Sequence, residues 1–353
     1  MKNKNFTKTL IKWYLANKRD LPWRNTNDPY RIWLSEIMLQ QTRIAQGLPY
    51  YLTFTREYPT IFDLANAPQD DVLKLWQGLG YYSRARNLHS TAKKVAFEMN
   101  GVFPNDYQGL LKLKGIGDYT ASAIASICYD EPVAVVDGNV YRVLARYFGI
   151  VLPINSGEGI KAFKSLAMEL IDPKQPGTYN QAIMEFGAMH CSPKLPLCHE
   201  CTLRTSCFAY AENKVGELPV KLKKQKITIR HFNYLVFLSE ENRTLLQQRT
   251  SKGIWQGLYE FPLIETEQEV FTEDLILTED FQKHTHHLDP EIRLYNNKPI
   301  KHILSHQHIY AKFWILSTKR LIKSSIHINS LTEYPVPVLL EKFINVFLQS
   351  DYD

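Results

Sequence analysis

Four of the five cysteines crowd into seventeen residues with the spacing C-x6-C-x2-C-x5-C: Cys191, Cys198, Cys201 and Cys207. This density in a chain expected to stay reduced indicates a metal centre rather than disulfides. A tetrahedral zinc ion and an iron–sulfur cluster both accept four thiolates, so the spacing leaves both open. Cys128 stands apart on an apolar helical pattern, which is typical of a small buried residue.

Hydrophobic periodicity divides the chain of 353 residues into two parts. Up to residue 212 the apolar residues recur at helical spacing, and Asp28 followed by Pro29 is a helix start. Helices are predicted over 29–48, 60–66, 70–78, 83–99, 106–112, 118–129, 139–148, 158–171 and 177–189. Beyond residue 227 the pattern changes to that of strands, at 227–239 and 308–317, with a final helix at 338–348.

Residues 213–226 break the helical pattern and are predicted to be a basic linker. They contain Lys221, Lys223, Lys224 and Lys226, which suit either a solvated tether or contacts with phosphates. The predicted domains are therefore an all-α domain over 1–212 and an α+β domain over 227–350.

The net charge of +6 permits binding to nucleic acid without demonstrating it. There is no run of 18 apolar residues, and the polar N-terminus lacks the apolar core of a signal peptide. A soluble cytoplasmic protein is expected.

Gly115 and Gly117 lie between two predicted helices in the stretch LKGIG. A turn with two glycines can present backbone N–H groups to an anion, and the next helix N-terminus adds its dipole. An ordinary helix–helix turn is the alternative. In a basic chain, a DNA phosphate is a reasonable ligand, and Ile116 is expected to anchor the turn from inside.

Two carboxylic residues are candidates for chemistry. Helical spacing places Glu36 on one side with Gln40 and Arg43, either as part of a solvated face or as a desolvated acid with a raised pKa. Asp137 follows an apolar run and precedes a helix, which suits an ordinary N-cap or a carboxylate aimed at a developing positive charge.

Aromatic and arginine side chains alternate in RDLPWR at 19–24 and in GLGYYSRARNL at 78–88. Such residues can stack on bases and contact phosphates, and they serve equally well as the core and rim of a helical domain.

Taken together, these stretches resemble the MutY-type adenine DNA glycosylases over nearly the whole chain. The matching segments, in order, are 21–24, 33–42, 78–82, the helix–hairpin–helix at 113–120, 136–140, the four cysteines, 257–262 and 304–306. The resemblance implies an all-α helix–hairpin–helix glycosylase domain with an iron–sulfur cluster loop. Its six-helix barrel would cover about 28–132, and a cluster subdomain would combine 1–27 with 133–212. A C-terminal Nudix-like (MutT-like) α+β domain would follow, and residues 227–353 lack the Nudix hydrolase signature.

The resemblance also implies a monofunctional DNA glycosylase of base excision repair, acting as a monomer. It would excise adenine mispaired with 8-oxoguanine or guanine in duplex DNA, after flipping the base. Glu36 would protonate N7 of adenine and Asp137 would stabilise the oxocarbenium-like sugar, with Tyr119 and Asn139 beside it. The four cysteines would hold a [4Fe–4S] cluster. A bacterial-type protein of the cytoplasm, associated with the nucleoid through its DNA, is expected.

Further residues are implied to contact the DNA. The hairpin glycines would hold a phosphate. The residues implied in base or lesion recognition are Arg19, Trp23, Gln41, Tyr81, Gln181, Ser305 and His306. Three positions depart from the family pattern: Leu304 replaces a Phe, and Lys114 and Asp118 replace a Pro and an Arg.

Two rival functions are distinguishable. A bifunctional glycosylase/lyase of the endonuclease III-like branch carries a lysine nucleophile where this chain has Tyr119, and tyrosine cannot form a Schiff base. A non-catalytic lesion sensor would not need both Glu36 and Asp137, which are present.

Overall fold

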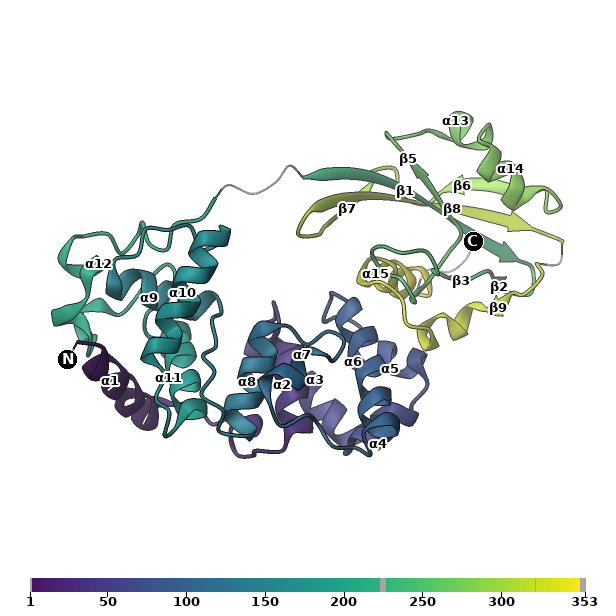
Figure 1. The fold of residues 1–353 in the computed structure, drawn as a ribbon. Coiled ribbons are helices and arrows are strands. Elements are labelled where there is room, and N and C mark those ends of the chain that lie inside the picture. The colour runs from purple at the N-terminus through teal and green to yellow at the C-terminus, as the bar shows by residue number, and fades with distance from the viewer. Residues whose placement is uncertain (1, 223–226, 321, 350–353) are drawn as a thin grey trace. The chain divides into compact units, whose positions relative to one another are not determined.

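The structure is a computed structural model and describes residues 2–222, 227–320 and 322–349. Figure 1 shows helices through the first part of the chain and a sheet with flanking helices in the second. The predicted combination of an all-α domain and an α+β domain is confirmed.

The chain divides into two compact units. The first comprises Met1–Asn66 and Asn87–Lys223, and the second comprises Ala67–Arg86 and Lys224–Asp353. The second unit thus includes a short helical segment that the predicted boundaries assign to the domain over 1–212.

The helical region begins with a helix that the sequence analysis did not predict, α1 (Lys2–Asn17). The remaining elements up to residue 211 are η1 (Pro22–Arg24), α2 (Pro29–Leu39), α3 (Ile44–Glu57), α4 (Ile61–Asn66), α5 (Gln69–Leu75), α6 (Ser83–Lys93), the π-helix η2 (Lys94–Glu98), α7 (Tyr107–Leu111), α8 (Asp118–Cys128), α9 (Gly138–Phe148), α10 (Gly157–Leu170), α11 (Pro176–Met189), η3 (Cys198–Glu200), η4 (Arg204–Ser206) and α12 (Phe208–Ala211).

The prediction of one helix over 29–48 is wrong. Asp28 caps α2 as expected, accepting a bond of 3.0 Å from the backbone N–H of Tyr30. The helix then ends at Leu39, and Gln41 has a left-handed φ of 57° before α3 begins. Glu36 and Arg43 therefore share no helical face.

The helices nearest the cysteines pack around a common core. Phe6 and Leu10 of α1, Leu144 of α9, Phe163 of α10 and Phe186 of α11 are all buried in one hydrophobic cluster. Burial of such side chains stabilises the fold by roughly 1.5–3 kcal/mol each. This core holds the N-terminus of α9 and the length of α11 in fixed positions.

Residues 213–222 of the predicted linker contact the helical unit at Leu218 and Val220, although several of their side chains are exposed. Leu218 is buried, its carbonyl accepts a bond from Arg146, and the carbonyl of Val220 accepts one from the backbone of Ile154. The apolar side chains explain why residues 213–222 associate with the helical unit. Three of the four predicted phosphate-contacting lysines, Lys223, Lys224 and Lys226, lie outside the described residues.

A mixed sheet forms the centre of the second unit. Its strands are ordered β5 (Leu263–Thr266), β1 (Thr228–Ser239), β8 (Gln307–Thr318) and β6 (Glu291–Leu294), and β7 (Ile300–Ile303) also pairs with β8. The strands β1 and β8 run parallel over twelve residue pairs, and the other pairs in the sheet are antiparallel. The smaller strands are β2 (Arg243–Thr244), β3 (Gln247–Gln248), β4 (Tyr259–Glu260) and β9 (Ile326–His327).

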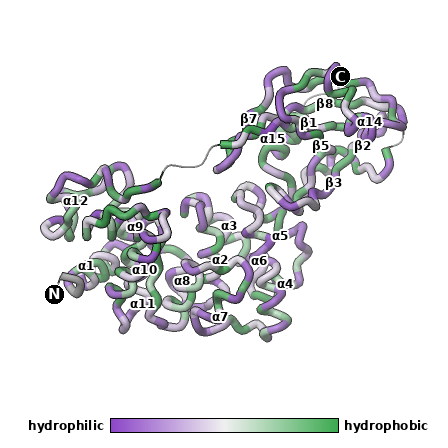
Figure 2. The backbone as a smooth tube through the Cα atoms, turned by 45° about the horizontal axis from the view of Figure 1, so that its top comes forward, coloured by the Kyte–Doolittle hydropathy of each residue, from purple (hydrophilic) through white to green (hydrophobic). Residues whose placement is uncertain are grey.

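Alternate residues of the central strands bury opposite faces of this sheet. Trp314 of β8 packs with Phe281 from α14 (Glu279–Thr285), close to α13 (Thr272–Ile276). Its neighbour Phe313 stacks on Phe343 of α15 (Val338–Phe347), with ring centroids 3.8 Å apart. Figure 2 shows hydrophobic stretches along β1 and β8, as burial on both faces requires. The predicted strands and final helix are confirmed within two residues.

None of the described helices is both long enough and apolar enough to cross a lipid bilayer.

Candidate active site

A cavity of about 420 Å³ opens in the first unit, within the range of small-ligand sites. It combines side chains from the turn around η1, from α2, from the start of α8, from the N-terminus of α9 and from α11. Seven of the site residues predicted from the sequence line it: Arg19, Trp23, Glu36, Tyr119, Asp137, Asn139 and Gln181.

Glu36 is buried in this cavity, with 9% of its surface exposed. Its pKa is raised to about 7, because burial and, to a smaller extent, the charge of Asp137 outweigh a hydrogen bond from Tyr119 and the charge of Arg24, both of which lower it. A carboxyl group that still holds its proton near neutral pH can act as a general acid.

Asp137 caps α9 and faces the cavity at the same time. One carboxylate oxygen accepts backbone bonds of 2.9 Å from Asn139 and 2.8 Å from Val140. The other accepts a bond of 2.8 Å from the side-chain amide of Asn139. Burial raises the pKa of Asp137, while these three hydrogen bonds and Arg142 oppose the rise. The two roles predicted for Asp137 from the sequence, a helix N-cap and a carboxylate that faces the reaction, are therefore compatible.

Tyr119 is the second residue of α8, and its side chain lines the cavity. Burial first, and then the charges of Glu36 and Asp137, raise its pKa well above the ordinary value, so the phenol keeps its proton. Its oxygen lies 3.3 Å from the sulfur of Met184. Tyr119 thus offers a neutral hydroxyl beside both carboxyl groups.

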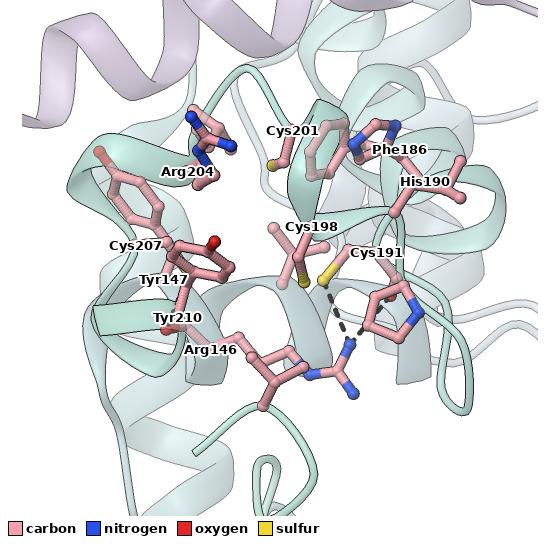
Figure 3. A pocket seen from close by; sticks show the side chains of 15 residues that line it. Arg146, Tyr147, Phe186, His190, Cys191, Cys198, Cys201, Arg204, Cys207 and Tyr210 are labelled. Carbon is pink, nitrogen blue, oxygen red and sulfur yellow. Dashed lines mark hydrogen bonds between the residues drawn. The ribbon is translucent and has the colours of Figure 1, made fainter. Parts of the chain in front are cut away.

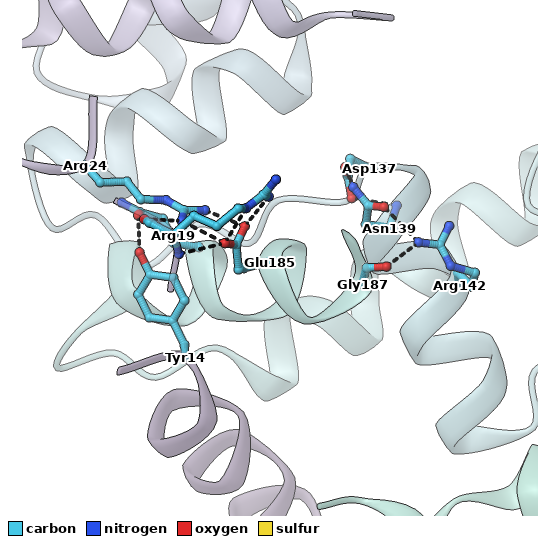
Figure 4. Close-up of polar contacts among 9 residues, drawn as sticks. Tyr14, Arg19, Arg24, Asp137, Asn139, Arg142, Glu185 and Gly187 are labelled. Atoms are coloured by element: carbon cyan, nitrogen blue, oxygen red, sulfur yellow. Dashed lines mark hydrogen bonds and ion pairs between the residues drawn. The ribbon is translucent and has the colours of Figure 1, made fainter. Parts of the chain in front are cut away.

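Two further residues belong to this site, Glu185 and Arg142, and neither was predicted from the sequence. Glu185 lies one turn after Gln181 on α11, and its carboxylate binds both Arg19 and Arg24, as Figure 4 shows. Gln181 itself accepts a bond of 2.5 Å from the hydroxyl of Tyr14. The helical spacing of Gln181 and Glu185 was the available signal.

Arg142 joins the N-terminus of α9 to its surroundings. Its guanidinium donates bonds of 2.8 Å to the side-chain oxygen of Asn139 and 2.6 Å to the carbonyl of Gly187 (Figure 4). A third bond, of 2.7 Å, goes to the carbonyl of Cys191. An added Cβ at Gly187 would lie 2.7 Å from the Cβ of Asn139, so only glycine allows α11 this close. Asn139, and through it Asp137, is held in one orientation.

The helix–hairpin–helix consists of α7, a tight turn and α8. Gly115 has a φ of 80°, and an added Cβ would lie 2.8 Å from that of Asn87. Gly117 is the N-cap of α8 and has open space around it. Ile116 is buried, as expected. The turn leaves the backbone at the start of α8 accessible, as an anion site requires, and neither glycine lines the main cavity.

The four clustered cysteines line one separate pocket, and none is in a disulfide. In Figure 3 the sulfurs of Cys191 and Cys198 are turned toward the same space, and Arg146 lies 3.4 Å from the Cys191 sulfur. Burial raises the pKa of Cys201 to about 11. Four thiols with a neighbouring guanidinium fit a group that binds thiolates. Across residues 2–222, 227–320 and 322–349, no three or more His, Cys, Asp or Glu side chains converge as ligands of a single ion.

The remaining predicted contacts lie outside these pockets. A cavity of about 560 Å³ in the second unit is lined by Tyr81, Ser305 and His306, and the hydroxyls of Tyr81 and Ser305 share a hydrogen bond. Leu304 lines it too. Tyr81 has a left-handed φ of 48°, and Gln41 in the first unit one of 57°. Such backbone strain in non-glycine residues is frequent at functional sites.

Comparison with known proteins agrees with this architecture. Residues 34–156 match the family described as HhH-GPD superfamily base excision DNA repair protein, and residues 233–346 match the NUDIX domain. A solved thermostable thymine-DNA glycosylase is 31% identical with a TM-score of 0.56, covering 60% of this chain and 97% of its own. A non-covalent endonuclease III–DNA complex, 21% identical, aligns over 59% of this chain and 95% of its own with a TM-score of 0.52, which shows the fold alone.

Helix–hairpin–helix base excision repair proteins are thus the class that the fold and its cavity define. Curated adenine DNA glycosylases align beyond the helical part. That of Buchnera aphidicola subsp. Baizongia pistaciae is 35% identical, covering 91% of this chain and 88% of its own. That of Mus musculus is also 35% identical, covering 85% of this chain and 68% of its own. The chain belongs to the adenine DNA glycosylase family.

Proposed function

We propose that this protein is a monofunctional glycosylase that hydrolyses the N-glycosidic bond of adenine mispaired with 8-oxoguanine, or with guanine, in duplex DNA. The observation that carries the proposal is the cavity that unites Glu36, Tyr119 and Asp137. Its acid has a pKa raised to about 7 and stands beside a second carboxyl group.

The chemistry follows from these two carboxyl groups. The target nucleotide leaves the stack and enters the cavity. Glu36 gives its proton to N7 of adenine while the C1′–N9 bond breaks, and the electron pair of that bond leaves with the base. Asp137 faces the positive charge that develops on the sugar. Water then adds at C1′ and returns a proton to Glu36, which restores the starting state.

Tyr119 supports hydrolysis without strand cleavage. Its phenol stays protonated and has no amine with which to form a Schiff base. We expect no intrinsic β-elimination. A borohydride-trapped covalent adduct in high yield that disappears on Tyr119→Phe substitution would contradict this assignment.

For the base opposite adenine we assign Tyr81, Ser305 and His306 to lesion recognition. The shared cavity and the hydrogen bond between the Tyr81 and Ser305 hydroxyls support this role. Gln41 is assigned to the gap left in the stack, with its strained backbone as support. Leu304 offers no aromatic face at this cavity.

The hairpin is assigned to the DNA backbone. Gly117 and the first N–H groups of α8 would bind a phosphate near the flipped nucleotide. Binding through phosphates predicts an affinity that falls steeply with salt.

Cys191, Cys198, Cys201 and Cys207 would hold a [4Fe–4S] cluster, which would tie the loop after α11 to α12. The donor set and the guanidinium of Arg146 support this assignment. Purified protein should show the broad visible absorption of iron–sulfur centres. Colourless protein with stoichiometric zinc after anaerobic preparation would overturn it. We expect the protein to act in the cytoplasm, at the nucleoid, as a monomer.

The decisive experiment is a single-turnover assay on duplexes with adenine opposite 8-oxoguanine, guanine, thymine or cytosine, with and without alkali. Strand breaks should need alkali, and release should be fastest opposite 8-oxoguanine. Glu36→Gln should bind the mispaired duplex and release no adenine. Near-normal adenine release by that variant would show that Glu36 is not the general acid.

A further inference from the structure

The carboxylate of Glu185 accepts five hydrogen bonds from two arginines. One oxygen accepts bonds of 2.8 Å from Nε of Arg19 and 2.9 Å from Nη1 of Arg24. The other accepts bonds of 2.6 Å from Nη2 of each. The backbone N–H of Arg19 adds a fifth bond, of 3.1 Å. Only 1% of the Glu185 side chain is exposed, so one buried negative charge holds two guanidinium groups (Figure 4).

The two arginines belong to the same cavity as the general acid. Arg19 and Arg24 both line it with Glu36. Arg24 donates a further bond of 2.9 Å to the carbonyl of Arg19 and lies 5.5 Å from the centre of the Tyr14 ring. The N–H groups of both guanidiniums that face Glu185 are therefore already hydrogen-bonded to its carboxylate. Without that carboxylate, the nearest acidic partners in the cavity would be Glu36 and Asp137.

We propose that Glu185 is a positioning residue that holds Arg19 and Arg24 away from Glu36, so that no guanidinium pairs with the general acid and keeps it ionised. This cluster of Glu185, Arg19 and Arg24 has a net charge of about +1. That charge favours binding of an electron-rich base without ionising Glu36. This inference rests on the proposed function of Glu36.

The pKa of Glu36 is sensitive to the position of these arginines. Burial is the main reason that its pKa is raised, and the charge of Arg24 already opposes that rise. The charged or titratable groups that line the cavity with Glu36 are Arg19, Arg24, Arg43, Tyr119, Asp137, Arg142 and Glu185. Of these, Glu185 and Asp137 are the acidic ones, so loss of Glu185 would leave four arginines lining the cavity with Asp137 as the one carboxyl group besides Glu36.

The test is the pH dependence of single-turnover adenine release by the full-length protein, from about pH 5 to about pH 9. Wild-type protein should lose rate above the pKa of Glu36, about 7. In Glu185→Gln this alkaline limb should move down by about one pH unit, so that the rate falls roughly tenfold near pH 8 and little near pH 5. In Arg24→Gln the limb should move up, whatever happens to the plateau rate.

The double variant Glu185→Gln/Arg24→Gln restores the wild-type charge, and its limb should return toward the wild-type position. Glu265→Gln is the matched control, because Glu265 also holds an arginine, Arg230, through two bonds but lies outside the cavity. It should leave the limb in place.

A purely structural role makes a different prediction. If Glu185→Gln and Arg24→Gln lower the rate by the same factor at every pH with the limb unmoved, the proposal is wrong. If Glu185→Gln does not fold, by its thermal melt, the double variant is compared with Arg24→Gln: a lower limb in the double variant supports the proposal, because Arg19 has been released, and equal limbs contradict it. A wild-type profile without an alkaline limb, or normal release by Glu36→Gln, would instead refute the proposed function of Glu36.

Discussion

Asp137 shares a cavity with Glu36, and its negative charge adds to burial in raising the pKa of Glu36 to about 7. The two acids are not equivalent. Asp137 has three hydrogen bonds to its carboxylate that oppose a rise in its own pKa, whereas Glu36 has one, from Tyr119. Hydrogen bonds to a carboxylate favour its ionised form, so the surroundings of Asp137 favour the charged state more than those of Glu36 do.

Glu36→Gln should stabilise the protein at alkaline pH. The folded-state pKa of Glu36 lies above its ordinary value of 4.5, so the native state binds more protons and stability falls as pH rises from about 4.5 through about 7. Above that range the buried charge costs at most about 3 kcal/mol. Urea unfolding should show a gain of roughly 1–3 kcal/mol near pH 8 and little change near pH 4. A variant that is less stable than wild type at pH 8 would show that the carboxylate is well solvated.

Asn139→Ala should slow adenine release and move the acid limb of the pH profile upward. The variant removes the amide that donates to Asp137, and this bond helps to keep the pKa of Asp137 down. The rate should fall roughly tenfold or more at neutral pH. Single-turnover assays across pH measure both effects. Asn155→Ala removes an exposed amide that does not line the cavity and should change neither, so equal behaviour of the two variants would exclude a specific role.

The two hairpin glycines should respond oppositely to alanine. Gly115→Ala strains a φ of 80° and crowds Asn87, and should cost about 1–3 kcal/mol of stability. Gly117→Ala meets open space and should keep its stability while losing affinity for duplex DNA, because the methyl group would stand where a phosphate approaches. Chemical denaturation and DNA titration separate the two. Unchanged DNA affinity in Gly117→Ala would rule out the phosphate site there.

Lys164→Met should weaken DNA binding through Asp118. The ammonium of Lys164 lies 3.0 Å from both oxygens of this carboxylate, which sits in the first turn of α8 beside the proposed phosphate site. Without Lys164 the carboxylate would repel a phosphate. Asp118→Asn should restore affinity in the double variant, and the pair should be non-additive. Additive losses would mean that Lys164 contacts the DNA directly.

Local signals predicted most of the fold. Asp28 and Pro29 identified the start of α2, and the strand-like stretches at 227–239 and 308–317 became the two long central strands. The break after Leu39 was not predictable from periodicity, because the apolar spacing continues through α3 while the backbone turns at Gln41. The packing of Leu218 also escaped prediction, since it depends on a partner, Arg146, 72 residues away.

The sequence predicted several residues of the candidate site but not the contacts that connect them. Glu36, Asp137 and Tyr119 were identified because they belong to motifs that resemble a known family. Glu185 and Arg142 belong to no such motif, and their importance lies in contacts with residues distant in sequence, such as Arg19 and Cys191. Single-sequence reasoning cannot supply those distances.

The guanidinium of Arg146 makes the chain after α12 a mechanical neighbour of the cysteines. It donates to the carbonyl of Leu218 on one side and to the carbonyls of Ser192 and Pro193 on the other, next to Cys191. Residues 213–222 are thus bonded to the cysteine loop through Arg146, and to Ile154 through the carbonyl of Val220. A cut after Ala211 would remove this anchor, so a fragment ending there should lose the proposed cluster faster than one ending at residue 222.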